Sequence, residues 1–159
     1  MSMQTDTETT TLARPQTRLL ERLEAYWALT KSRQTLLLLA TGVAGYISAR
    51  PHSASFAEAA LMMVSLFAAI SGTTALNMVL DRDIDARMAR TSDRPLPGGV
   101  LSPTAAALFG GALVGVGVGI ALWMSGAFGV VIAAGVFFDL LVYTVWLKRR
   151  SPWSIVFGG

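Results

Sequence analysis

The sequence predicts an all-α membrane protein with about four transmembrane helices and the start of a fifth. Hydrophobic residues make up 53% of its 159 positions and charged residues only 14%, whereas about 25% of the residues in a soluble domain are charged. Apolar segments at 34–49, 59–80, 104–124 and 126–147 reach or approach the ~20 residues that cross a bilayer. A buried core helix of a soluble protein could explain one such segment, but four together predict a membrane protein.

The residues inside these segments support this prediction. The third segment contains five glycines: Gly110, Gly111, Gly115, Gly117 and Gly119. Glycine weakens a helix in water, whereas small residues allow helices in a membrane to pack closely. The sequence has no cysteine, which excludes disulfides, thiolate metal sites and a cysteine nucleophile.

The segments before the first span differ in composition. Residues 1–15 are polar and rich in threonine, which predicts a disordered tail and not a signal peptide. Residues 16–33 are predicted to form an amphipathic helix at the membrane surface, and residues 34–159 the membrane domain. The apolar residues of the amphipathic helix recur at helical spacing with charges between them: Leu19, Leu20, Leu23, Tyr26 and Trp27.

Basic residues predict the orientation of the chain. Of 13 Lys and Arg residues, all but Arg50 lie before the first apolar segment, in the second connection or after the fourth segment. Because loops rich in Lys and Arg stay in the cytoplasm, this face is predicted to be cytoplasmic. The tail has few arginines and several acids, which disfavours a mitochondrial transit peptide and favours the inner membrane of a bacterial cell.

Residues 77–99 run out of the second apolar segment and read NMVLDRDIDARMARTSDRPLPGG. Asn77, Asp81 and Asp85 recur at intervals of four, which lines them along one face of a helix. Two carboxylates and an amide offer oxygen ligands suited to Mg²⁺, which completes its shell with water and substrate phosphate. Arg90 and Arg94 suit the phosphate, since a guanidinium pairs with it through two bonds. The alternative is a solvated loop in which aspartate and arginine neutralise each other, and spacing alone does not decide between them.

Three stretches resemble a known family. NxxxDxxxD followed by RTxxRPLpxG resembles the first aspartate-rich motif of the intramembrane aromatic prenyltransferases. LTKSRQTLLLL resembles the family's LTKPR entry to the first span, and YTVWLKRRSPWSIVFGG resembles its YTxxLKRxTPxNIxxGG element. Together they cover about residues 25–159 and most closely resemble the protoheme IX farnesyltransferase (haem O synthase) family. Ser32 and Ser154 depart from the proline and asparagine expected there.

The resemblance implies nine transmembrane helices around a cavity that opens toward the cytoplasm. Farnesyl diphosphate would be held through Mg²⁺ and its chain transferred, with hydration, to a vinyl group of haem b. Haem-copper oxidase assembly proteins are expected partners and nucleic acid is not. By position, Asn77, Asp81 and Asp85 would bind the metal and act in catalysis. The basic residues expected to neutralise the leaving diphosphate are Arg90, Arg94, Lys148 and Arg149.

Members of this family run to about three hundred residues and carry a second aspartate-rich motif beyond the GG element. The chain is therefore expected to be a fragment with part of the diphosphate site. Two alternatives stay open. One is another intramembrane prenyltransferase acting on a quinone precursor or chlorophyll-type ring, and the other is a non-catalytic membrane subunit or cation-binding protein.

Asp139 and His52 have two explanations each. Asp139 lies inside the fourth segment, where an ionisable group usually faces a cavity or a partner, and Tyr143 follows one helical turn later. Both could line a substrate cavity, or Asp139 could be a protonated or hydrogen-bonded packing residue. His52 is the only histidine and is expected to be an exposed loop residue, with haem ligation as the alternative.

Overall fold

The computed structural model describes residues 15–30, 32–50, 52, 55–89 and 95–147, and within these ranges it contains helices and no strand. In chain order, the elements are α1 (Pro15–Leu29), α2 (Ser32–Ala49), α3 (Phe56–Leu80), α4 (Arg82–Asp85), α5 (Pro103–Met124) and α6 (Gly126–Phe137), which continues into a π-helix, η1 (Phe138–Leu147). The prediction of an all-α fold is confirmed. All of the predicted tail but its last residue, and the predicted fifth segment from Trp153, lie outside the described residues.

Within the described ranges, three helices are long and apolar enough to cross a membrane. They are Phe56–Leu80, Pro103–Met124 and Gly126–Trp146, the last of which runs through α6 into η1. In α2 the apolar stretch, Thr35–Ala49, is shorter. The chain is therefore a multi-pass membrane protein.

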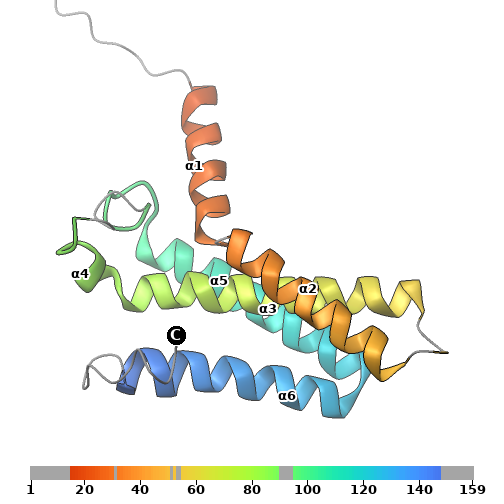
Figure 1. Cartoon of the computed structure of the whole chain (residues 1–159). Helices are drawn as coiled ribbons and strands as arrows, with labels where there is room; N and C mark the ends of the chain where they lie inside the picture. Colours follow the sequence, from red (N-terminus) through yellow and green to blue (C-terminus); the bar gives the residue numbers. More distant parts are fainter. Residues whose placement is uncertain (1–14, 31, 51, 53–54, 90–94, 148–159) are drawn as a thin grey trace, which may run out of the picture.

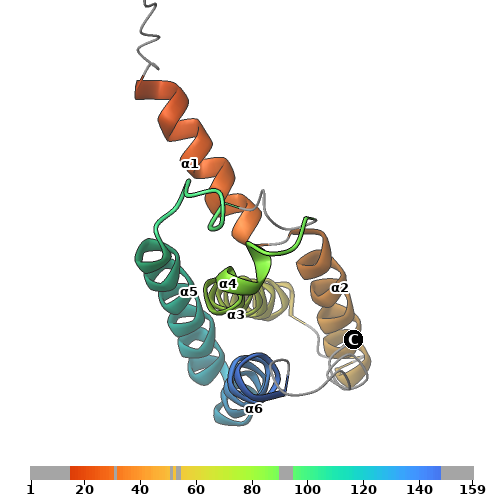
Figure 2. The same cartoon turned by 90° about the vertical axis from the view of Figure 1, so that its left-hand side faces the viewer.

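The central helix of the bundle is α3. In the view along the bundle, α2, α5 and α6 surround it (Figure 2), and its most extensive interface is with α5. The short helix α4 and the turn that leads into α5 lie at the same end of the bundle (Figure 1). At this end of α3, Met78 is buried and Asn77 is half-buried, whereas Leu80 is exposed.

Small residues bring α3 and α5 into direct backbone contact. A Cβ added to Gly117 would lie 2.5 Å from the backbone nitrogen of Ala69, and one added to Gly72 would lie 2.6 Å from the carbonyl oxygen of Gly110. The buried hydroxyl of Ser65 donates a hydrogen bond to the carbonyl oxygen of Gly117 over 2.7 Å. Dispersion contacts and interhelical hydrogen bonds of this kind hold helices together where water is absent.

At the α4 end, α1 packs against the bundle. Its Ala25 and Leu29 are buried in a cluster with residues from α3, α5 and the turn before α5: Ala75, Met78, Leu96, Leu101 and Ala106. The ring of Tyr26 lies 4.8 Å from that of Phe109, centroid to centroid.

The other face of α1 is apolar and exposed. Leu20, Leu23 and Trp27 are 60%, 56% and 61% exposed, and α1 stands at a steep angle to the other long helices (Figure 1). This geometry suits a helix that lies along a membrane surface, and the predicted interfacial placement of residues 16–33 stays a prediction. Tyr26, expected on the apolar face, packs into the bundle instead.

A pair of glycine substitutions tests the α3–α5 contact. We expect Gly117→Ala to destabilise the protein by about 1–3 kcal/mol, the usual effect of overpacking, because the methyl group meets the backbone of Ala69. Gly115→Ala is the matched control, since an added Cβ there has nothing within 4 Å. Thermal unfolding of the purified protein in detergent measures both. Equal melting temperatures for the two variants would contradict the close backbone contact.

Candidate metal and diphosphate site

Asn77, Asp81 and Asp85 stay one turn apart across a bend in the chain. Helix α3 ends at Leu80, and Asp81 has φ −91° and ψ 0°. Even so, the N–H of Asp81 donates to the carbonyl oxygen of Asn77 over 2.9 Å, and that of Asp85 to Asp81 over 2.8 Å. The sequence predicted one continuous helical face. The structure bends that face at Asp81 and keeps its spacing.

Burial separates Asp81 and Asp85 from Asp83, which lies between them. Asp81 and Asp85 are each 6% exposed, whereas Asp83 and the neighbouring Arg82 and Arg87 are exposed. Carboxylates are almost never buried unless they are paired or bind a metal. A fully solvated loop does not explain why these two are buried, which leaves pairing with basic side chains and metal binding as the two explanations.

The third member of the stripe, Asn77, is held by the fourth apolar segment. Its side-chain nitrogen Nδ2 donates to Oδ2 of Asp139 over 2.7 Å. The hydroxyl of Thr144 lies 2.8 Å from Oδ1 of Asn77 and 2.9 Å from the carbonyl oxygen of Asp139, and it shares its one proton between these two acceptors. The structure therefore connects Asp139 to the predicted site.

The π-helix η1 makes this arrangement possible. An α-helix turns by about 100° per residue, so residues five apart, such as Asp139 and Thr144, would point about 140° away from each other. Hydrogen bonds in a π-helix run from i to i+5, which brings the two side chains to the same face. Sequence reasoning paired Asp139 with Tyr143 and missed Thr144, because it assumed α-helical spacing and the residue pattern gives no sign of the π-helix.

The residues at the α3–α4 junction fit a divalent cation that is shared with a phosphate ligand. Mg²⁺ is usually bound by one or two carboxylates and takes its other ligands from water and phosphate, and Asp81 and Asp85 supply two. The C-terminal end of α3 adds partial negative charge. Among the described residues, no three side chains of the His, Cys, Asp and Glu types gather as a metal-binding group. Two carboxylates are the protein ligands of a Mg²⁺ ion that takes its other ligands from water and phosphate.

The four basic residues expected at the diphosphate, Arg90, Arg94, Lys148 and Arg149, lie outside the described residues, so their roles stay predictions. The turn that follows Arg94 is described. Leu96 and Leu101 are each 5% exposed, and Gly99 has a φ of +73°, a conformation that favours glycine. Buried leucines on both sides of the turn fix the place where the aspartate-rich connection ends.

An apolar groove of about 450 Å³ lies between α2, α3 and α6 and has Asp139 in its lining. Its other lining residues are almost all apolar and include Ile70, Val131 and Val136. Because Asp139 bonds to Asn77, the groove adjoins the candidate site. The arrangement places oxygen ligands beside a space suited to a hydrocarbon chain.

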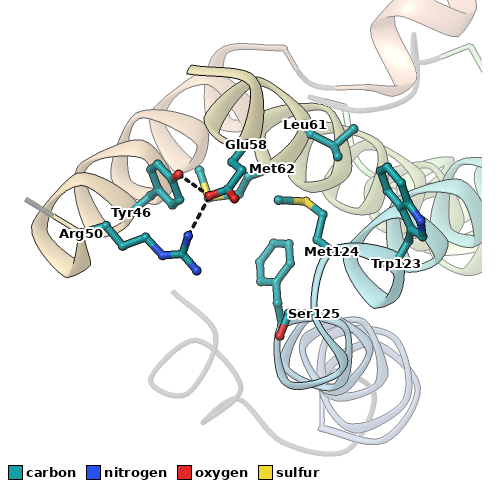
Figure 3. A pocket seen from close by; sticks show the side chains of 9 residues that line it. Tyr46, Arg50, Glu58, Leu61, Met62, Trp123, Met124 and Ser125 are labelled. Carbon is teal, nitrogen blue, oxygen red and sulfur yellow. Dashed lines mark hydrogen bonds and ion pairs between the residues drawn. The ribbon is translucent and has the colours of Figure 1, made fainter. Parts of the chain in front are cut away.

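A second cavity, of about 440 Å³, is lined by residues from the end of α2, the start of α3 and the α5–α6 junction (Figure 3). Its polar groups bond to each other, since Glu58 accepts from Arg50 over 2.7 Å and from Tyr46 over 2.8 Å. Glu58 precedes Asp81 by 23 residues, or roughly 35 Å at 1.5 Å per helical residue. These contacts join α2 to the first turn of α3 and are too distant to belong to the aspartate site. His52, in the connection between those helices, is exposed.

Comparison with known protein families matches residues 38–159 to the UbiA prenyltransferase family. The chain belongs to this family. It is 50% identical over 140 residues to the protoheme IX farnesyltransferase of Archaeoglobus fulgidus, with 88% of this chain and 49% of the relative covered. It is 43% identical over 138 residues to that of Korarchaeum cryptofilum, covering 87% and 46%, and 40% identical over 139 residues to that of Rhizobium etli, covering 84% and 42%.

The chain thus spans about half the length of these curated relatives. No solved structure matches it. The motif that the sequence singled out lies within the part that matches the UbiA family.

Neutral variants of the buried aspartates test the site of this UbiA family member. Mg²⁺ and inorganic diphosphate should stabilise the protein against unfolding. We expect Asp81→Asn and Asp85→Asn each to raise the Mg²⁺ concentration needed for this stabilisation by at least about tenfold, because a metal ligand loses its charge. The measurement is thermal unfolding against Mg²⁺ concentration at fixed diphosphate. The exposed Asp83→Asn is the matched control, and an equal loss in all three variants would indicate a diffuse charge effect instead of a site.

Proposed function

We propose that the protein transfers a farnesyl group from farnesyl diphosphate to a vinyl group of haem b, and that this chain supplies the Mg²⁺–diphosphate site. The observation that carries the proposal is that Asp81 and Asp85 are buried at the end of α3, one turn from Asn77, whose amide bonds to Asp139 in the lining of an apolar groove. The acceptor is inferred from the relatives, which are named protoheme IX farnesyltransferases over most of this chain.

The reaction breaks the allylic C–O bond of farnesyl diphosphate. Diphosphate leaves with the bonding electrons, and a carbon–carbon bond forms between the farnesyl group and one vinyl carbon. Water adds its hydroxyl group to the other vinyl carbon, and the remaining proton of the water is released. Mg²⁺, when bound, would stabilise the charge that develops on the diphosphate. Asp81 and Asp85 would hold the metal at the end of α3, and Arg90 and Arg94 would bind the departing anion.

The groove would contribute in a different way. Its apolar lining suits the farnesyl chain and keeps bulk water from the reacting carbon until the acceptor has been attacked. Thr73 and Thr74 also line the groove, and the hydroxyl of Thr73 donates within its own helix, to the carbonyl oxygen of Ala69 over 2.7 Å. That internal bond lets a polar residue face hydrocarbon.

We also propose an orientation in the membrane. The aspartate-rich connection would face the cytoplasm, because most basic residues lie on its side of the membrane. In a bacterium this would be the inner membrane, where haem b and farnesyl diphosphate are both within reach of the site. Oxidase assembly proteins that receive the product stay predicted partners.

The test is a product assay on membranes that contain the full-length gene product. With haem b, deuterated farnesyl diphosphate and Mg²⁺, we expect a haem product whose mass has risen by one deuterated farnesyl group and one hydroxyl group. Asp81→Asn should lower its rate of formation at least about hundredfold, since a group that stabilises developing charge is lost.

The control is Asp83→Asn, which should keep most of the activity. A prenylated quinone precursor or chlorophyll-type ring, formed in the same membranes while haem b stays unmodified, would overturn the choice of acceptor. The absence of any prenylated product from a folded full-length protein would overturn the enzymatic proposal itself.

A further inference from the structure

We propose that Asp139 is a positioning residue that, together with Thr144, fixes the orientation of the Asn77 side chain at the metal–diphosphate site. The inference rests on the proposed function, because it assigns Asn77 a task at that site. Nδ2 of Asn77 donates a 2.7 Å hydrogen bond to the Asp139 carboxyl group. Thr144, which also contacts the Asn77 amide, is buried and only 1% exposed.

An asparagine amide can sit in two orientations that exchange its oxygen and nitrogen. Oδ2 of Asp139 accepts the bond from Nδ2, as an oxygen of an ionised carboxyl group does, and this contact favours the orientation in which Nδ2 faces Asp139. The reversed amide would bring two acceptor oxygens to hydrogen-bond distance. Thr144 donates to Oδ1 over 2.8 Å, which supports the same orientation from the other side.

These contacts leave part of the amide available to a ligand. An asparagine side chain has two N–H donors and two carbonyl lone pairs, and the bonds to Asp139 and Thr144 use one of each. The backbone carbonyl of Asn77 also accepts from the N–H of Asp81 over 2.9 Å. A shift of Asn77 would therefore be transmitted directly to the first buried aspartate.

The competing explanation is that Asp139 only ties η1 to α3. Interhelical hydrogen bonds are common in membrane bundles and each contributes modestly to stability. A tie of that kind would affect unfolding and leave ligand affinity unchanged. Residues that orient metal ligands behave differently, since their loss typically weakens metal affinity by 10–100-fold. Affinity and stability measured together therefore separate the two roles.

The experiment uses the full-length gene product in detergent, with Mn²⁺ as a paramagnetic probe in the presence of inorganic diphosphate. We expect Asp139→Leu to weaken Mn²⁺ binding by about tenfold or more. Asp139→Asn should recover most of the affinity, because its amide oxygen can accept the bond from Asn77. A second variant, Thr144→Val, removes the hydroxyl that contacts the Asn77 amide. Its matched control is Thr41→Val, since Thr41 is exposed and bonds within its own helix.

A double-mutant cycle tests whether Asp139 acts through Asn77. In an Asn77→Ala background, Asp139→Leu should change the affinity by no more than about twofold, because the group that it orients is gone. Additive losses in the cycle, or wild-type affinity in folded Asp139→Leu, would overturn the inference while leaving the proposed function intact. Wild-type protein that fails to bind Mn²⁺ with diphosphate would overturn both. If Asp139→Leu does not fold, the same cycle with Thr144→Val decides.

Discussion

The backbone contact between α3 and α5 is the constraint on which the rest of the structure depends. Gly117 meets the backbone of Ala69, and Gly72 meets that of Gly110, at separations that no larger residue allows. This contact leaves the remaining faces of α3 to α2 and to α6 with η1 (Figure 2). A helix enclosed on several sides can carry polar residues at its end without exposing them to lipid, and α3 carries Asn77 and Asp81 there.

Placing polar groups at this depth requires partners for each of them. The chain meets the requirement for Asn77 by a local change of helix type. In η1 the spacing of five residues aligns Asp139 with Thr144, and both then reach the amide of Asn77. Departures from α-helical geometry inside helices frequently mark functional sites, and here the departure contacts Asn77, one turn before Asp81.

Much of this architecture could be predicted from the sequence, for physical reasons. Long apolar runs gave the positions of the membrane helices to within about a turn, and spacing of four residues identified Asn77, Asp81 and Asp85 as a group. The bend at Asp81 and the π-helix could not be predicted, because both arise from packing between segments distant in the sequence. The link from Asn77 to Thr144 crosses 67 residues, and no local pattern encodes it.

In the proposed function, Asp81 and Asp85 hold a metal–diphosphate group at the end of α3. A crystal structure of the full-length gene product with Mn²⁺ and farnesyl diphosphate would test this role, because anomalous scattering locates the metal. The account predicts a manganese peak in direct coordination with carboxylate oxygens of Asp81 and Asp85, and the farnesyl chain in the groove beside Asp139. A metal bound elsewhere, or a diphosphate held at the far cavity beside Arg50, would contradict it.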